Sequence, residues 1–126
     1  MADRRQPVLA TSLAPTRMTP ALARDQVERH IPPHLAALRQ DAALVTTELV
    51  TNAVIHGRSV VDLDLYVDDD GICLSVADLG PGVPAIRVPD TTGGGYGLHI
   101  VEKLATRWGH QAIHPQGKRV WAELAR

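Results

Sequence analysis

The longest periodic pattern of apolar residues runs from residue 35 to residue 56 and predicts a helix. Its apolar positions are three and four residues apart and therefore share one helical face: Leu35, Leu38, Ala42, Val45, Leu49 and Ala53. Gly57 follows this stripe and is suited to end the helix, because glycine readily adopts the left-handed conformation that is common just after the last helical turn.

Two shorter elements are expected before this helix. Residues 8–13, VLATSL, are typical of an edge strand, and a helix is predicted from Pro20 to about Ile31. Thr19 is expected to be the N-cap of that helix, and the prolines at positions 32 and 33 end it. Residues 1–6 are expected to form a disordered tail, so residues 7–126 form a single domain.

Beyond Gly57 the period of the pattern becomes two, which indicates β-strands. In residues 61–67, valine and leucine alternate with aspartate and tyrosine, as in a strand with one buried face and one solvated face. Residues 69–71, Asp-Asp-Gly, are a hairpin turn signal. In the return strand, one face carries Ile72, Leu74 and Val76, and the other carries Cys73, Ser75 and Ala77.

The C-terminal part predicts one more helix and a second hairpin. One helical face is shared by Leu98, Val101, Leu104, Ala105 and Trp108. Two short strands are expected at residues 112–114 and 120–124, with a turn at Gly117. Trp121 has the opposite parity to the apolar residues of its strand, so we expect it on the outer face of the sheet, where it could contact a second copy in a homodimer.

The order of these elements indicates the fold class. A short strand is followed by two helices, a hairpin, a long loop, a helix and a second hairpin. Hairpins impose antiparallel pairing, and helices with single apolar stripes can cover one face of the sheet. We therefore predict an α/β (α+β) two-layer sandwich, with helices packed on one face of a mixed, mostly antiparallel sheet.

Composition narrows the classes of function. Of the 126 residues 44% are hydrophobic, enough for a core, and the formal net charge of −1 gives no general attraction to nucleic acid or to an anionic membrane. Cys73 is the single cysteine, which excludes an internal disulfide and a multi-cysteine metal site. No signal peptide and no apolar run long enough to span a bilayer are recognised, so we expect a cytoplasmic protein.

The first stretch with chemical potential is ELVTNAVIHG in the long predicted helix. Glu48, Asn52 and His56 are four residues apart and stack in one polar row beside the apolar stripe. An amide oxygen can bind Mg²⁺, and a carboxylate one turn away can orient a water or a hydroxyl. Taken alone, this row is better explained as a solvated helix edge.

The second stretch is VADLGPGVP at the end of a predicted strand. Asp78 has the inward parity of Val76, and a buried carboxylate requires a hydrogen-bond donor such as the exocyclic amine of adenine. Gly80 and Gly82 would let the backbone pass close to a flat ligand. An aspartate that caps its own turn explains the residue equally well.

The third stretch is TTGGGYGLHIVEKL, in which Gly93, Gly94, Gly95 and Gly97 precede a helix that begins near Leu98. The N-terminus of a helix offers free N–H groups and a partial positive charge, which suit a phosphate. A flexible linker is the alternative. The stretch is neither a Walker loop nor a dinucleotide-binding fingerprint.

Together and in this order, the three stretches resemble the motifs of the Bergerat-type (GHKL-type) ATPase superfamily, which includes DNA gyrase, histidine kinases and anti-sigma-factor serine kinases. ELVTNAVIHG is similar to the N box, DLGPG to the first glycine box and GGGYGLHIV to the second. The resemblance extends from about Leu35 to the C-terminus. The short chain and its final segment, RWGHQAIHPQGKRVWAEL, resemble the anti-sigma-factor kinase branch and its stand-alone actinobacterial members.

The resemblance implies a role for each matching residue. Glu48 would be the general base, Asn52 the Mg²⁺ ligand, and Asp78 the acceptor for adenine N6. Gly80 and Gly82 would shape the adenine pocket, while His56 and Gly57 would close the N-box helix beside the nucleotide. The phosphates would be bound by the second glycine segment, which consists of Gly94, Gly95, Tyr96, Gly97 and Leu98. Within it, the backbone N–H groups of Gly95, Gly97 and Leu98 would be the donors.

The resemblance thus implies an ATP- and Mg²⁺-dependent protein serine/threonine kinase that phosphorylates an antagonist protein and, in its unmodified state, holds a sigma factor. A second hypothesis is a non-catalytic switch, in which ATP orders the lid and controls a protein-binding surface. The observation behind this second hypothesis is the composition of the loop between Asp78 and Gly97, in which Arg87 is the single cation. Phosphoryl transfer usually requires a positive group near the γ-phosphate. The filled general-base position favours the kinase.

Overall fold

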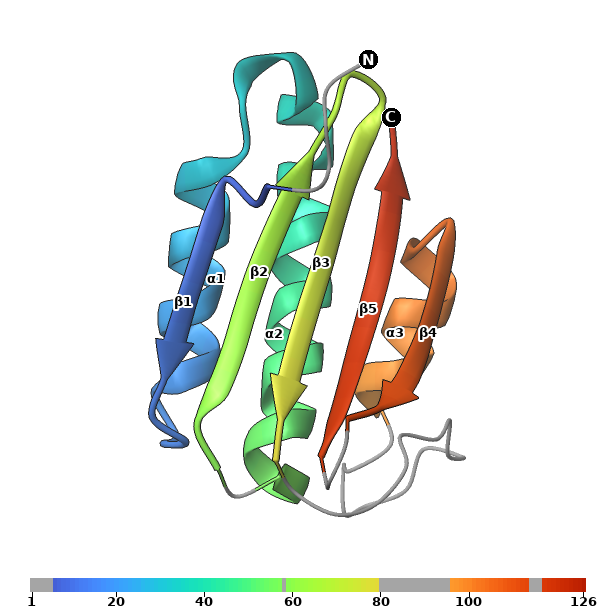
Figure 1. Cartoon of the computed structure of the whole chain (residues 1–126). Helices are drawn as coiled ribbons and strands as arrows, with labels where there is room; N and C mark the ends of the chain where they lie inside the picture. The colour runs from blue at the N-terminus through green and yellow to red at the C-terminus, as the bar shows by residue number, and fades with distance from the viewer. Residues whose placement is uncertain (1–5, 58, 80–95, 114–116) are drawn as a thin grey trace.

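The computed structural model of the chain describes residues 6–57, 59–79, 96–113 and 117–126. Figure 1 shows the elements in the predicted order of strand, helices, hairpin, helix and hairpin. Their bounds are β1 Leu9–Leu13, α1 Thr19–His30, the 3₁₀ helix η1 Pro33–Leu38, α2 Arg39–Gly57, β2 Val61–Val67, β3 Gly71–Asp78, α3 Tyr96–Leu104, β4 Arg107–Ala112 and β5 Lys118–Ala125.

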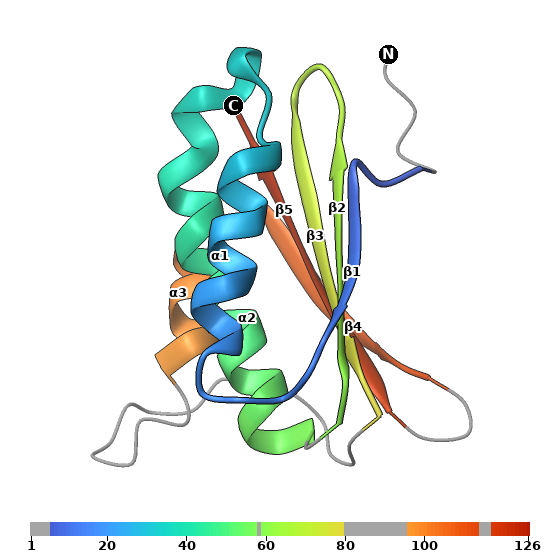
Figure 2. The ribbon, with the colours of Figure 1, turned by 90° about the vertical axis from the view of Figure 1, so that its left-hand side faces the viewer.

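The strands form one five-stranded sheet with the order β1-β2-β3-β5-β4. Each of the four pairings is antiparallel, so the sheet contains no parallel pair within the described ranges. Figure 2 shows the sheet edge-on, with α1, α2 and α3 all on one side of it. The predicted two-layer sandwich is therefore confirmed, with β1 at one edge as expected.

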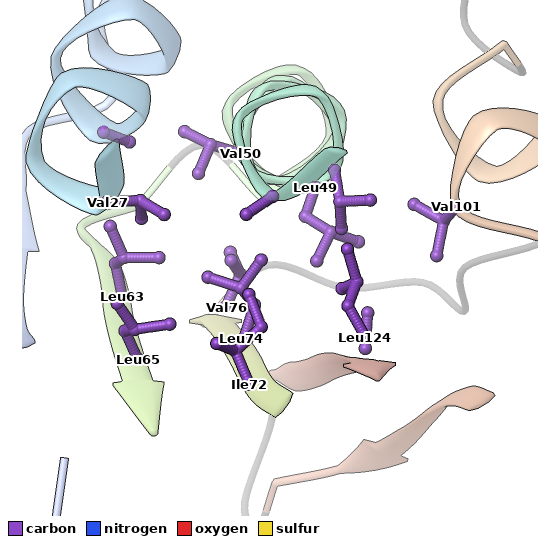
Figure 3. Packing of buried hydrophobic residues seen from close by; sticks show 14 of the residues in the cluster. Val27, Leu49, Val50, Leu63, Leu65, Ile72, Leu74, Val76, Val101 and Leu124 are labelled. Carbon is purple, nitrogen blue, oxygen red and sulfur yellow. The ribbon is translucent and has the colours of Figure 1, made fainter. Parts of the chain in front are cut away.

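The core lies between the sheet and the helices, as Figure 3 shows. The alternation in β2 and β3 directs Leu63, Leu65 and Leu74 toward the helices, and all three are fully buried. In α2, Leu49 faces the sheet beside Val101 of α3, while other side chains of the same helix meet α1. Burial of this apolar surface is the main term that holds the two layers together, at roughly 25 cal/mol per Å².

The long helix begins later than the apolar pattern predicts. Residues 33–38 form η1, and Leu35 has non-helical backbone angles of φ −115° and ψ 20°. Leu35 and Leu38 are nevertheless buried in the predicted core. Residues three apart lie on the same side of a 3₁₀ turn as well as of an α-helix, so the spacing alone could not separate the two.

Thr19 was expected to cap α1, but this prediction is wrong. Thr19 is the first residue of the helix, and Met18 precedes it without a side-chain cap. The buried Thr19 hydroxyl donates to the carbonyl of Ala14 and accepts from the N–H of Thr16 at 3.0 Å. Its side chain therefore stabilises the β1–α1 connection rather than the helix end.

The C-terminal elements also differ from the prediction. Helix α3 ends at Leu104, and Trp108 belongs to β4, which replaces the strand expected at residues 112–114. Trp108 still packs against the core, because it lies on the inner face opposite Ala122. Gly117 has a φ of 124°, as a glycine turn requires.

Trp121 lies on the outer face of the sheet, as its parity predicts. It is paired in register with Gly109, where a Cβ would come within 2.8 Å of the indole ring. The guanidinium of Arg107 lies 5.8 Å from the ring centroid. Among the described helices, none is long and apolar enough to cross a membrane.

Candidate functional site

One end of the sandwich brings together the elements that carry the candidate residues. In Figure 1 this is the lower end, where α2 and β3 finish and where β5 and α3 begin. Helices α2 and α3 lie beside each other on the same face of the sheet (Figure 2). Segments that are far apart in the sequence therefore meet at one end of the core.

Asp78 is the last residue of β3 and lies on the inner face, as predicted. Only 4% of it is exposed, and directly across the antiparallel pair lies Lys118, which is also 4% exposed. The two side chains form an ion pair with 3.2 Å between Lys118 Nζ and Asp78 Oδ1. Two opposite charges are thus buried together where the apolar stripe of the sheet ends.

The backbone around Asp78 is held closely on both sides. Gly117 approaches so near that a Cβ would lie 2.5 Å from the Asp78 carbonyl oxygen and 3.0 Å from the Cα of Leu79. The backbone N–H of Leu79 donates to Ser59 Oγ at 2.8 Å. A glycine is required at position 117 both by this contact and by its positive φ.

Glu48 and Asn52 lie one turn apart on α2, and both are half-buried. Successive residues of a helix are rotated by about 100°, so Glu48 and Val50 point to opposite sides of Leu49. Figure 3 shows Val50 on the side of α1 and Leu49 toward the sheet and α3. The Glu48–Asn52 row therefore follows the edge of α2 that borders α3. The N-terminus of α3 lies at the end of the sandwich where α2 finishes.

Burial raises the pKa of the Glu48 carboxyl above its ordinary value of 4.5. The folded state therefore binds this proton more tightly than the unfolded state does, and the carboxyl destabilises the fold once the pH rises through its folded pKa. A raised pKa brings a carboxylate closer to the range in which it acts as a general base at neutral pH.

We predict that Glu48→Gln stabilises the protein near pH 7, and that this gain shrinks as the pH falls toward 4. The neutral amide does not carry the desolvation cost that the buried carboxylate carries when it is ionised. Thermal unfolding of both proteins across this pH range measures the difference. Glu28→Gln on α1 is the control, because the side chain of Glu28 is 42% exposed. An equal gain for Glu48→Gln at every pH would contradict the prediction.

Helix α3 places its first turn at the same end of the sandwich. It begins at Tyr96, and the first four N–H groups of a helix have no partner within the helix. Leu98 is in this turn, and its side chain is buried in the core with 3% exposure. The Leu98 side chain therefore anchors the helix in the core. The group of Leu98 that could bind a phosphate is its backbone N–H, which is the role predicted for it.

Several candidate residues lie wholly or partly outside the described residues. Gly80, Gly82, Gly94 and Gly95 are outside them altogether. His56 and Gly57 are the last two residues of α2, and Tyr96 and Gly97 are the first two of α3, but only their backbone placement is described. Their predicted contacts with a nucleotide stay predictions.

Lys118 is the residue of the site that the sequence analysis missed. A signal was present, because Lys118 has the same parity as Val120, Ala122 and Leu124 and so continues the inward stripe of β5. The apolar alternation ends in a lysine on β5, just as it ends in an aspartate on β3. When one strand finishes with an inward acid and its antiparallel neighbour begins with an inward base, the two residues are expected to form a buried ion pair.

The donor set in this region suits a nucleotide better than a metal bound by protein groups alone. Among residues 6–57, 59–79, 96–113 and 117–126, no group of three or more histidine, cysteine, aspartate or glutamate side chains could hold a metal ion. Mg²⁺ commonly takes only one or two protein ligands and keeps phosphate oxygens and waters for the rest. The half-buried Asn52 amide fits that pattern as a single protein ligand.

A sequence model of the histidine kinase-like ATPase domain matches residues 12–124, which is nearly the whole chain. A small sandwich with an inward acid at a strand end and a polar row beside a helix N-terminus defines a nucleotide-binding domain of this class. The chain belongs to the histidine kinase-like ATPase domain family, and this membership implies that it binds ATP. A search of curated proteins gave no match.

Proposed function

We propose that the protein is an ATP- and Mg²⁺-dependent regulatory kinase of the anti-sigma-factor type, which phosphorylates a serine or threonine of an antagonist protein. The observation that carries the proposal is the half-buried Glu48, with a raised pKa, one helical turn from Asn52 on the edge of α2 beside α3. A half-buried carboxylate beside the proposed Mg²⁺ ligand stands where phosphoryl transfer would need a general base.

Each residue then has a chemical task. Asp78 accepts a hydrogen bond from the adenine amine, and the first turn of α3 donates N–H groups to the phosphates. Asn52 would hold a Mg²⁺ ion, which would supply the positive charge that neutralises the phosphates. The acceptor hydroxyl oxygen attacks the γ-phosphorus, the bond to the β-phosphate oxygen breaks, ADP leaves, and Glu48 takes the hydroxyl proton.

The proposed partners follow from this activity. They are a sigma factor, which the protein holds, and an antagonist protein that receives the phosphoryl group, both in the cytoplasm. The outer face of the sheet supports a homodimer, because the half-buried Trp121 lies there on the face away from the helices. Direct binding to nucleic acid or to a membrane is not part of the proposal.

The first test is the affinity for ATP, measured by isothermal titration with and without Mg²⁺. We expect Mg²⁺-dependent binding, and Asn52→Ala should weaken it by at least tenfold, because the amide is the protein ligand of the ion. Thr51→Ala is the matched control, because this neighbouring half-buried residue of α2 lies on the side of α1. Equal Mg²⁺-dependent binding by both variants would overturn the Asn52 assignment.

The second test is transfer of labelled γ-phosphate from ATP to a purified antagonist of the anti-anti-sigma type. We expect one phosphoryl group on a serine or threonine per acceptor molecule. If ATP binds but no label is transferred while the affinity for the partner depends on ATP, the non-catalytic switch replaces the kinase.

A further inference from the structure

We propose that Lys118 is a second base-recognition residue, whose ammonium donates a hydrogen bond to the ring nitrogen next to the amino group that Asp78 accepts from. This inference rests on the proposed placement of adenine at Asp78. It adds a specificity-determining side chain, from a different strand, to the nucleotide site.

The first argument is position. Asp78 and Lys118 are directly opposite in the β3–β5 pair, so both side chains project toward the helices at the same level of the sheet. The next inward pair along these strands, Val76 and Val120, is apolar and buried. The acceptor and the donor therefore stand side by side at the edge of an apolar surface, which is the setting in which a flat base can stack and form strong hydrogen bonds.

The second argument is spare hydrogen-bonding capacity. An ammonium group has three N–H donors, and the Lys118 side chain is 95% buried. Within the described ranges, its one hydrogen-bond partner is Asp78 Oδ1 at 3.2 Å. Further donors are available to a ligand that reaches Asp78, and a buried cation gains from satisfying them.

The third argument is the chemistry of the base. The adenine amino group is a donor, and it is flanked by two ring nitrogens, N1 and N7, that are acceptors. A carboxylate beside an ammonium presents the complementary acceptor and donor. A site with Asp78 alone would recognise the amino group, whereas the pair also recognises the adjacent nitrogen.

The test compares the affinities of ATP, 1-deaza-ATP and 7-deaza-ATP. ATP has both ring nitrogens, whereas a C–H group replaces N1 in the first analogue and N7 in the second. A hydrogen bond to a charged group contributes about 1.5–3 kcal/mol, or roughly 10- to 150-fold in affinity. We therefore expect the wild type to bind one of the two deaza analogues at least tenfold more weakly than ATP. Lys118→Met should bring that ratio close to one, and Lys118→Arg should restore it.

The outcomes separate this inference from the function on which it rests. If the wild type binds ATP and both deaza analogues equally, Lys118 does not contact a ring nitrogen, whether or not the Met variant folds. A ratio that is the same in wild type and Lys118→Met also overturns the inference. If the wild type binds none of the three nucleotides, the placement of adenine at Asp78 fails, and this inference fails with it.

Purine riboside triphosphate, which lacks the amino group, tests Asp78 separately. We expect weaker binding than for ATP in the wild type and no such difference in Asp78→Ala, which removes both side-chain acceptor oxygens. Loss of this discrimination together with retained deaza discrimination would assign the ring nitrogen to Lys118 and the amine to Asp78. Amino-group discrimination without deaza discrimination would leave Asp78 in place and overturn the role of Lys118.

Discussion

Replacing Asp78 by asparagine is expected to lower the free energy of unfolding by about 3–5 kcal/mol, the usual cost of removing one member of a buried ion pair. The cost arises because Lys118, with only 4% exposure, loses the carboxylate that lies 3.2 Å from its ammonium. The opposite single change, Lys118→Met, should cost a similar amount for the converse reason. Denaturant unfolding of the nucleotide-free protein measures both.

The double variant Asp78→Asn/Lys118→Met provides the decisive comparison. Replacing both members of a buried pair removes both charges, and such changes are often close to neutral. We therefore expect the double variant to be more stable than either single variant, which requires a coupling energy of at least about 3 kcal/mol in the cycle, because each single loss is about 3–5 kcal/mol. Additive losses would show that the two side chains do not stabilise each other.

Nucleotide binding should respond differently from stability. The double variant regains stability but lacks the charged acceptor for the adenine amine and the ammonium for the ring nitrogen, so it should bind ATP at least tenfold more weakly than the wild type. Asp62→Asn is the control, because Asp62 lies on the exposed outer face of the same sheet, where it accepts from the Ser12 hydroxyl at 2.6 Å. ATP binding by the double variant at wild-type affinity would remove Asp78 from the site.

The fold could be predicted from the sequence because its periodic signals are strong and consistent. The alternation in residues 61–67 and 72–77 defines a hairpin with one inward face, and the structure pairs these strands in that way. The errors occurred where two geometries satisfy the same spacing. Residues 35 and 38 are three apart in a 3₁₀ turn, and Trp108 reaches the same core from β4 that it would have reached from a longer helix.

The candidate site was predictable to the extent that it depends on parity within one element. The Glu48–Asn52 row and the inward Asp78 follow from helical and strand periods, and the structure places Asp78 on the inner face. Lys118 was missed because a lysine at the start of a strand usually lies in solvent. Its burial depends on its pairing partner in β3, which is 40 residues away in the sequence.

Glu48→Gln is expected to reduce phosphoryl transfer to the antagonist by roughly 10²–10⁴-fold, the range typical for loss of a general base. The affinity for ATP should stay within about twofold of the wild type, because the amide keeps the shape of the side chain and Asn52 and Asp78 are unchanged. Single-turnover transfer of labelled γ-phosphate and isothermal titration measure the two quantities separately. Glu28→Gln on α1 is the control, since this acid lies outside the site.

The same substitution has a property that makes a loss of transfer interpretable. Because burial raises the pKa of Glu48, the glutamine variant should be more stable than the wild type at neutral pH, so unfolding cannot account for lost activity. Lost transfer with intact ATP affinity and higher stability therefore assigns Glu48 to the chemical step. Transfer that survives in Glu48→Gln would place the general base at another residue. A wild type that binds ATP but transfers no phosphoryl group would favour the switch, because Glu48 would then lower the stability without contributing to catalysis.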